Sequence, residues 1–113
     1  MEEAINSEAL DELRSLMGDS LNEVLQTFLD FVPDQINELS TAVFNNDADG
    51  VFNLAHKMKS SSSSIGALGL AHTAEQIELI GRAGSTEGAA ELLEQLKGMY
   101  SDAEALLHEE LKK

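Results

Sequence analysis

Apolar residues recur every three or four positions over most of the chain, which is the spacing of amphipathic helices. No stretch shows the strict alternation or the β-branched density of a strand. Turn-type residues, mainly Gly, Asn and Asp, interrupt the helical pattern at several places. The pattern therefore predicts helices over about residues 8–17, 20–45, 50–65, 68–83 and 86–111.

The four longer ranges are joined by short connections, which predicts an all-α antiparallel four-helix bundle with a short additional N-terminal helix. Pro33 lies inside an unbroken apolar stripe of the second range, so we expect a kinked but continuous helix there. The residues placed to cap the helix starts are Ser7, Asp19 or Ser20, Asp47 or Asp49, and Ser85 or Thr86. A chain of 113 residues is the size of a single domain, residues 1–113.

Composition narrows the function classes. Twenty-one acidic against seven basic residues give a formal charge of −14, which argues against nucleic acid and anionic membrane surfaces as partners. The chain has no cysteine, so disulfides, thiol catalysis and cysteine-based zinc sites are excluded. Without a signal-peptide pattern or a long apolar run, we expect a cytoplasmic protein, and we expect it to be monomeric.

The third predicted helix carries the main candidate for chemistry, His56. On a helical wheel of about 100° per residue, the apolar residues of this helix gather on the side opposite the histidine: Val51, Leu54, Ala55, Met58 and Ile65. The residues on its own side are Phe52, Asn53, Lys59, Ser60 and Ser63. His56 is therefore predicted to face solvent, with a cation one turn away and small serines that leave the ring uncovered.

A solvent-facing imidazole with a pKa of about 6.5 is largely neutral near pH 7, so one ring nitrogen is free to act as a nucleophile. A phosphoryl group attached there would bring negative charge, which Lys59 is placed to offset. Ser60 and Ser63 are small enough to let another protein's active site close over the group. Because His72 and His108 lack such neighbours, we interpret them as surface or boundary residues.

The segment AHKMKSSSSSIGA, residues 55–67, resembles the signature of histidine-containing phosphotransfer (HPt) domains. In that family the phosphoacceptor histidine is followed by lysine at +3, usually glycine at +4, small residues, and Gly-Ala at the helix end. The upstream FLDFVPDQINEL is also similar to the second helix of the family, and the resemblance spans roughly residues 19–83. Ser60 departs from the pattern, because it stands where the family usually has glycine.

The resemblance implies an intermediate of a multistep phosphorelay, of the free-standing bacterial type. His56 would accept a phosphoryl group from a receiver-domain aspartate and pass it to another receiver, with Lys59 as electrostatic support. Gln76 would hydrogen-bond the imidazole or the phosphoryl group. The implied partners are receiver domains and a hybrid sensor kinase. The Mg²⁺ ion would belong to the receiver, and the chain itself would have no metal, no cofactor and no independent enzymatic activity.

Two further residues are candidates for partner docking. Phe52 lies on the exposed side of the wheel, where it either docks against an apolar receiver surface or tucks under an adjoining helix. Lys57 either contributes to docking, in the most electropositive helical segment outside the C-terminus, or is an ordinary solvated lysine. The sequence leaves both alternatives open.

Two other functions compete with the phosphorelay hypothesis. GDSL at residues 18–21 resembles the prosthetic-group site of acyl carrier proteins at Ser20, but too little chain precedes it for the helix and loop of those proteins. A helix cap is sufficient to explain this segment. The remaining alternative is a non-catalytic helical adaptor in which His56 is inert.

Overall fold

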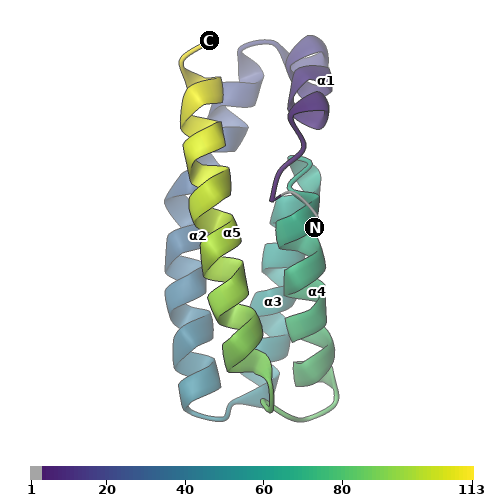
Figure 1. Cartoon of the computed structure of the whole chain (residues 1–113), viewed down its shortest axis with the longest axis vertical. Coiled ribbons are helices and arrows are strands. Elements are labelled where there is room, and N and C mark those ends of the chain that lie inside the picture. Colours follow the sequence, from purple (N-terminus) through teal and green to yellow (C-terminus); the bar gives the residue numbers. More distant parts are fainter. Residues whose placement is uncertain (1–3) are drawn as a thin grey trace.

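The computed structural model describes residues 4–113, and within this range it contains five α-helices and no strand. Their bounds are Ser7–Met17 (α1), Ser20–Phe44 (α2), Ala48–Ser64 (α3), Leu68–Arg82 (α4) and Ala89–Leu111 (α5). Helices α2 to α5 run alternately up and down as an antiparallel bundle, and α1 sits at one end of it (Figure 1). The expected all-α bundle with an additional N-terminal helix is confirmed. No helix between residues 4 and 113 is long and apolar enough to cross a membrane.

The starts of α1 and α3 use side-chain caps. Asn6, rather than the expected Ser7, caps α1, because its side-chain oxygen accepts a hydrogen bond from the backbone N–H of Glu8 at 2.8 Å. Asp47 caps α3 as expected and accepts from the N–H of Gly50 at 3.0 Å. A side-chain oxygen at such a position satisfies one of the free N–H groups of the first turn.

Helix α5 begins at Ala89, later than the sequence pattern indicated. Gly88 precedes it with φ 85°, a left-handed conformation in which the helix cannot continue toward the N-terminus. Ser85 accepts a hydrogen bond from the N–H of Glu87 at 3.0 Å and so stabilises a turn instead of the helix start. The expectation that Ser85 or Thr86 caps this helix is therefore wrong.

Helix α2 runs without interruption through Pro33. The apolar stripe on both sides of the proline stays buried, with Val32 1% and Ile36 7% exposed. Packing of this stripe against the other helices stabilises the continuous helix despite the missing backbone donor. The expected continuity of α2 is confirmed.

The hydrophobic core runs the length of the bundle and extends under α1. Its largest fully buried apolar side chains are Ile5, Leu21, Leu25, Val32, Leu39, Met58, Ile65, Leu70, Ile77, Leu96 and Leu107. On the side of the bundle nearest α1, the backbone N–H of Asn6 donates to the carbonyl of Gly66 in the α3–α4 turn at 3.3 Å. Arg14 ties α1 to α5 through Glu110, with its Nε 2.9 Å from the Oε2 atom. These contacts close the end of the bundle.

Helices α3 and α4 approach each other closely at Gly81 of α4. A Cβ atom placed on this glycine would lie 2.6 Å from the backbone nitrogen of Phe52 and 2.8 Å from the carbonyl oxygen of Ala48. Only a residue without a side chain permits this backbone separation. The close approach sets the positions of the α3 and α4 side chains that form the site described below.

Tyr100, on α5, gives a test of the packing. It is the only tyrosine, and the chain has no tryptophan. Burial and the nearby carboxylates of Glu104 and Asp30 raise its pKa to about 12. Because the folded protein favours the neutral phenol, Tyr100 contributes to the free energy of unfolding. This contribution is fully present below the unfolded-state pKa of about 10 and is lost as pH rises through the folded-state pKa.

We expect the phenolate absorbance of the native protein to rise with a midpoint near pH 12. In denaturant the same absorbance should rise near pH 10, the value of an exposed tyrosine. Circular dichroism at each pH should show that the helices persist over the range that is fitted. A native midpoint near 10 would contradict the buried position of this side chain.

Candidate functional site

His56 projects from the middle of α3 toward solvent, and its side chain is 55% exposed. On the opposite side of the same helix, Val51, Ala55 and Met58 are completely buried. The burial of this apolar face fixes the rotation of the helix and keeps the imidazole outside the core. The outward orientation expected from the helical wheel is confirmed.

The imidazole has a buried acidic partner, Glu78 of α4. The Nδ1 atom of His56 lies 2.9 Å from the Oε2 atom of Glu78, whose side chain is only 1% exposed. The other carboxylate oxygen, Oε1, forms an ion pair with the Nζ atom of Lys59 at 2.7 Å. The Nη2 atom of Arg82, one turn further along α4, lies 3.5 Å from Oε2. One buried carboxylate thus contacts the histidine and two cations.

These contacts decide the charge of Glu78. Its burial acts to raise its pKa, but the interactions with Lys59 and His56 outweigh burial and hold the pKa below its usual value. The carboxylate is therefore ionised near neutral pH and can only accept hydrogen bonds. The Nδ1 atom of His56 therefore carries a proton, and in the neutral imidazole this leaves the lone pair on Nε2, the ring nitrogen that Glu78 does not contact.

Phe52 and Arg82 extend the site by one helical turn from His56. The ring of Phe52 stacks near the imidazole, with centroids 6.1 Å apart and an interplanar angle of 19°. The guanidinium of Arg82 lies over the Phe52 ring, 5.6 Å from its centroid. Phe52 is therefore half-buried within the site itself, an arrangement between the two alternatives that the sequence left open.

The serine run has several structural roles. Ser61 and Ser64 donate side-chain hydrogen bonds to backbone carbonyls, Ser61 to Lys57 at 3.1 Å and Ser64 to Ser61 at 2.7 Å. Ser62 is fully buried, where a small side chain permits close packing. Ser60 and Ser63 are exposed on the side of His56. The outer serines are therefore small, exposed side chains on the side of α3 from which His56 projects.

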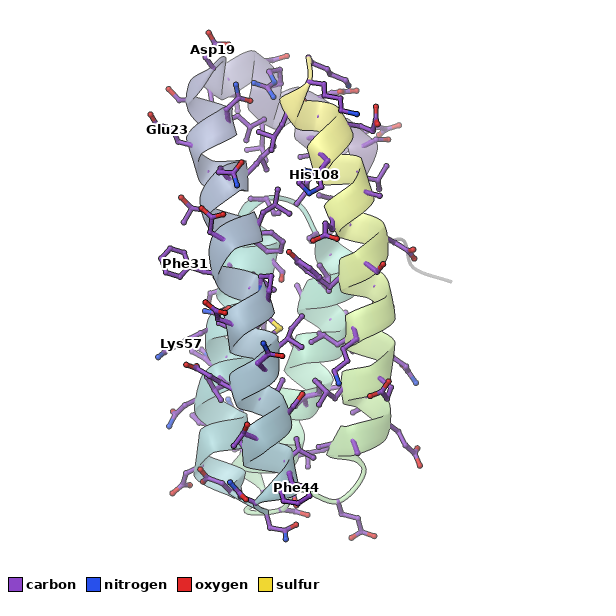
Figure 2. All side chains as sticks on the ribbon, turned by 90° about the vertical axis from the view of Figure 1, so that its left-hand side faces the viewer. Asp19, Glu23, Phe31, Phe44, Lys57 and His108 are labelled. Atoms are coloured by element: carbon purple, nitrogen blue, oxygen red, sulfur yellow. The ribbon has the colours of Figure 1, made fainter. Side chains whose placement is uncertain are left out.

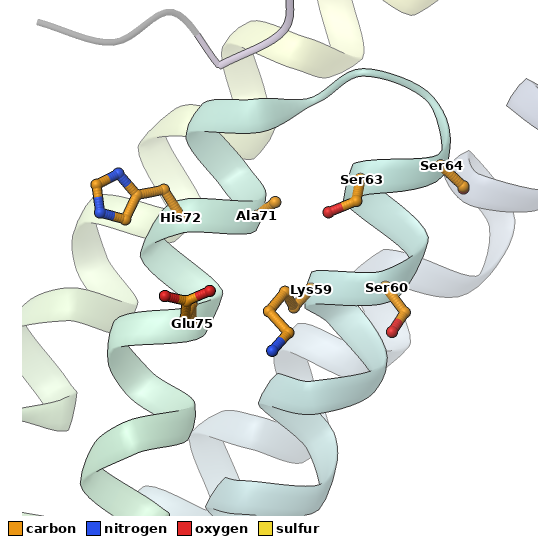
Figure 3. Close-up of a pocket in the computed structure, with 7 residues that line it drawn as sticks. All are labelled: Lys59, Ser60, Ser63, Ser64, Ala71, His72 and Glu75. Carbon is orange, nitrogen blue, oxygen red and sulfur yellow. The ribbon is translucent and has the colours of Figure 1, made fainter.

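A groove of about 640 Å³ lies beside the site, between α3 and α4. Figure 3 shows the residues that border it, from α3 Lys59, Ser60, Ser63 and Ser64, and from α4 Ala71, His72 and Glu75. Lys57, by contrast, points away from the bundle on the side of α2 (Figure 2). The groove therefore borders Lys59 and Ser60, which lie within about one helical turn of His56.

The sequence did not identify Glu78 or Arg82. Gln76 was expected at the imidazole, but its side chain is exposed and Glu78 occupies that place. Two residues correspond to about 200° of rotation on a helix, so positions 76 and 78 face almost opposite directions. A signal was present, because Glu78 falls on the face of α4 that Ala74 and Ile77 define as apolar, where an acidic residue needs a partner.

Other potential chemistry is sparse in the part of the chain that the structure describes. Across residues 4–113, no three His, Asp or Glu side chains come together in a group that could hold a metal ion. His108 is exposed on α5, and His72 is exposed on α4 beside the groove. Ser20, the candidate for prosthetic-group attachment, is the first residue of α2.

Comparisons with known proteins identify the family and similar structures. The model of the Hpt domain family matches residues 23–106. Among solved structures, the chain is similar to histidine-containing phosphotransfer protein B (HptB) from Pseudomonas aeruginosa PAO1, with a TM-score of 0.91 and 26% sequence identity. That match covers 99% of this chain and 97% of the other. A search of curated proteins found no match.

Proposed function

Because the chain belongs to the Hpt domain family, we propose that His56 carries the phosphoryl group of a multistep phosphorelay. Membership of this family implies histidine phosphotransfer, with the protein acting as a carrier rather than as an independent enzyme. The observation that most supports His56 is the contact of its Nδ1 atom with the buried carboxylate of Glu78, at 2.9 Å. In the neutral ring, a proton on Nδ1 leaves the lone pair of Nε2 to act as the nucleophile.

The proposed reaction uses His56 and Glu78 together. The Nε2 lone pair attacks the phosphorus of a phosphoaspartate on a receiver domain, so that a P–N bond forms, the P–O bond to the aspartate breaks, and the aspartate leaves as a carboxylate. The ring retains its proton on Nδ1 and becomes positively charged. The ionised Glu78 stabilises that charge and holds the ring orientation, as the buried acid does in catalytic triads. The reverse step delivers the phosphoryl group to another receiver.

The surroundings of His56 suit a reaction shared between two proteins. Ser60 and Ser63 are small and exposed, so they permit a receiver to approach the ring. The receiver supplies Mg²⁺ and most of the stabilisation of the transferring group. We further propose that Lys57 and the exposed edge of Phe52 contact the receiver, and that a hybrid sensor kinase supplies the phosphoryl group in the cytoplasm.

Two expected roles remain predictions. Gln76 does not occupy the place beside the ring, and a contact from it to the phosphoryl group would require the side chain to approach from its exposed position on α4. Lys59 was expected to support the phosphoryl group directly, and its ammonium forms an ion pair with Glu78 instead. A role for Lys59 through Glu78 therefore has more structural support than direct contact.

The proposal is tested by incubating the protein with a receiver domain that carries radiolabelled phosphate. We expect transfer of a label that is stable in base and labile in acid, as phosphohistidine is, and that mass spectrometry maps to the peptide containing His56. Labelling at His72 or His108 would contradict the assignment of the site. Modification of Ser20 by a phosphopantetheinyl transferase, without phosphotransfer, would support the acyl-carrier alternative, and the absence of both modifications would support the adaptor.

A further inference from the structure

The site holds two cationic side chains and only one carboxylate, so one positive charge is not neutralised within it. Lys59 and Arg82 each carry a positive charge, and both lie close to the single negative charge of Glu78. In a protein whose formal charge is −14, an excess of positive charge around one side chain is unusual. The surplus cation is available to a second anion.

The two cations are not held equally. The Nζ atom of Lys59 lies 2.7 Å from the carboxylate of Glu78, and the side chain is only 28% exposed, so the two form a close ion pair. Arg82 lies 3.5 Å away and is 62% exposed. At that distance the guanidinium makes no good hydrogen bond, whereas the cation–π contact with Phe52 keeps it beside the site. The guanidinium of Arg82 can therefore move away from Glu78 with little loss of interaction free energy.

Phosphorylation would loosen Arg82 from Glu78 further. When Nε2 bonds to phosphorus, the ring keeps its Nδ1 proton and gains a positive charge directly against Glu78. The carboxylate then has two close positive partners, His56 and Lys59, and its attraction for the more distant guanidinium falls. At the same time the phosphoryl oxygens bring negative charge that a planar guanidinium binds well.

Arg82 is also within reach. Its Nη2 atom and the Nδ1 atom of His56 both contact Oε2 of Glu78, at 3.5 and 2.9 Å, so Nη2 lies at most about 6.4 Å from the near edge of the imidazole. A phosphoryl group on Nε2 would lie across the ring from Nδ1, so the guanidinium would have to swing out past the ring to meet it. Rotation of the long arginine side chain covers such a distance without movement of the backbone. We propose that Arg82, rather than Lys59, binds the phosphoryl group on His56, while Lys59 keeps Glu78 ionised and in place. This inference rests on the proposed phosphoacceptor role of His56.

The test uses a small phosphoryl donor, so that receiver docking does not contribute. Phosphoramidate transfers its phosphoryl group to Nε2, with cleavage of its own P–N bond and release of ammonia. The extent and lifetime of phosphohistidine would be followed by phosphorus NMR in the wild type and in Arg82→Gln, Arg82→Lys, Lys59→Gln and Lys97→Gln. Lys97 is a matched control, because it is a partly exposed lysine of α5 that pairs with Glu94.

We expect Arg82→Gln to lower the rate or the equilibrium extent of phosphorylation about tenfold, the effect of losing one charge-assisted contact. Its thermal stability should stay near wild type, because its exposed ion pair contributes little. Arg82→Lys should restore part of the loss. Lys59→Gln should instead lower thermal stability and alter the nitrogen NMR signals of the unphosphorylated His56 ring, which Arg82→Gln should leave unchanged.

The proposal fails if Arg82→Gln is phosphorylated like the wild type while Lys59→Gln loses phosphorylation at unchanged stability, since Lys59 would then be the phosphoryl-binding cation. An equal loss in Lys97→Gln would overturn it as well, because the effect would reflect overall charge alone. If the wild-type protein acquires no label on His56 from either phosphoramidate or a receiver, the proposed function is contradicted. Normal labelling that does not respond to Arg82 contradicts only this inference.

Discussion

Replacement of His56 by glutamine is expected to abolish phosphotransfer and to leave the fold intact. Glutamine has no ring nitrogen that can bond to phosphorus, so the acid-labile label should fall to the background of the assay. The side chain at this position is 55% exposed, and surface substitutions of this kind usually change stability by no more than about 0.5 kcal/mol. The glutamine amide can still donate a hydrogen bond toward Glu78. This limits the loss of stability that would follow if the buried carboxylate lost its donor.

Transfer from a labelled receiver, together with thermal unfolding followed by circular dichroism, measures both parts of this expectation. His108→Gln provides the control, because it removes an exposed imidazole from α5 rather than from the site. It should be labelled like the wild type. Acid-labile label that persists in the folded His56→Gln protein would exclude His56 as the acceptor.

The largest expected effect on stability comes from Gly81→Ala. The new Cβ atom would lie 2.6 Å from the backbone nitrogen of Phe52, a separation that only a shift of α3 relative to α4 can relieve. Overpacking of this kind costs about 1–3 kcal/mol, and here the clashing atoms belong to the backbone and cannot rotate away. The cost should therefore lie at the upper end of that range, about 3 kcal/mol. After the gain of about 1 kcal/mol in helix propensity from alanine, we expect a net loss of about 2 kcal/mol.

Gly98 on α5 offers a matched control, because a Cβ atom added there meets nothing within 4 Å. Gly98→Ala should therefore raise the free energy of unfolding by about 0.5–1 kcal/mol, so the two identical substitutions should shift urea midpoints in opposite directions. Gly81→Ala should also slow phosphotransfer, because its shift of α3 displaces His56 from Glu78. A Gly81→Ala protein as stable as Gly98→Ala would contradict the close approach of α3 and α4.

The helices and the orientation of His56 were predictable because both follow from local periodicity. The apolar stripe of α3 determines which side faces the core, whatever that core contains. The start of α5 was harder to predict, because Ser85 and Thr86 resemble a helix cap in sequence, and the left-handed conformation of Gly88 decides the outcome. Such a conformation is a property of the packed turn rather than of the residue alone.

The polar contacts of the site were less accessible to sequence reasoning. Lys59 follows His56 by one turn, and spacing alone suggests that its charge serves whatever binds the histidine. The structure places that charge on Glu78 of α4, twenty-two positions after His56. Contacts between helices depend on the relative height and rotation of two elements, which the periodicity of each helix does not determine. The acidic residue on the apolar face of α4 was the one available indication.

The serine run of α3 has a further consequence, which concerns insertions and deletions. Homopolymeric stretches usually vary freely in length, but removal of one residue from a helix turns everything beyond it by about 100°. Met58 before the run and Ile65 after it are both buried in the same core, and Ile65 is only 1% exposed. The rotation would turn Ile65 out of that core. It would also displace the carbonyl of Gly66 from the N–H of Asn6. Individual serines can change to other small residues, but their number is constrained by the residues at both ends.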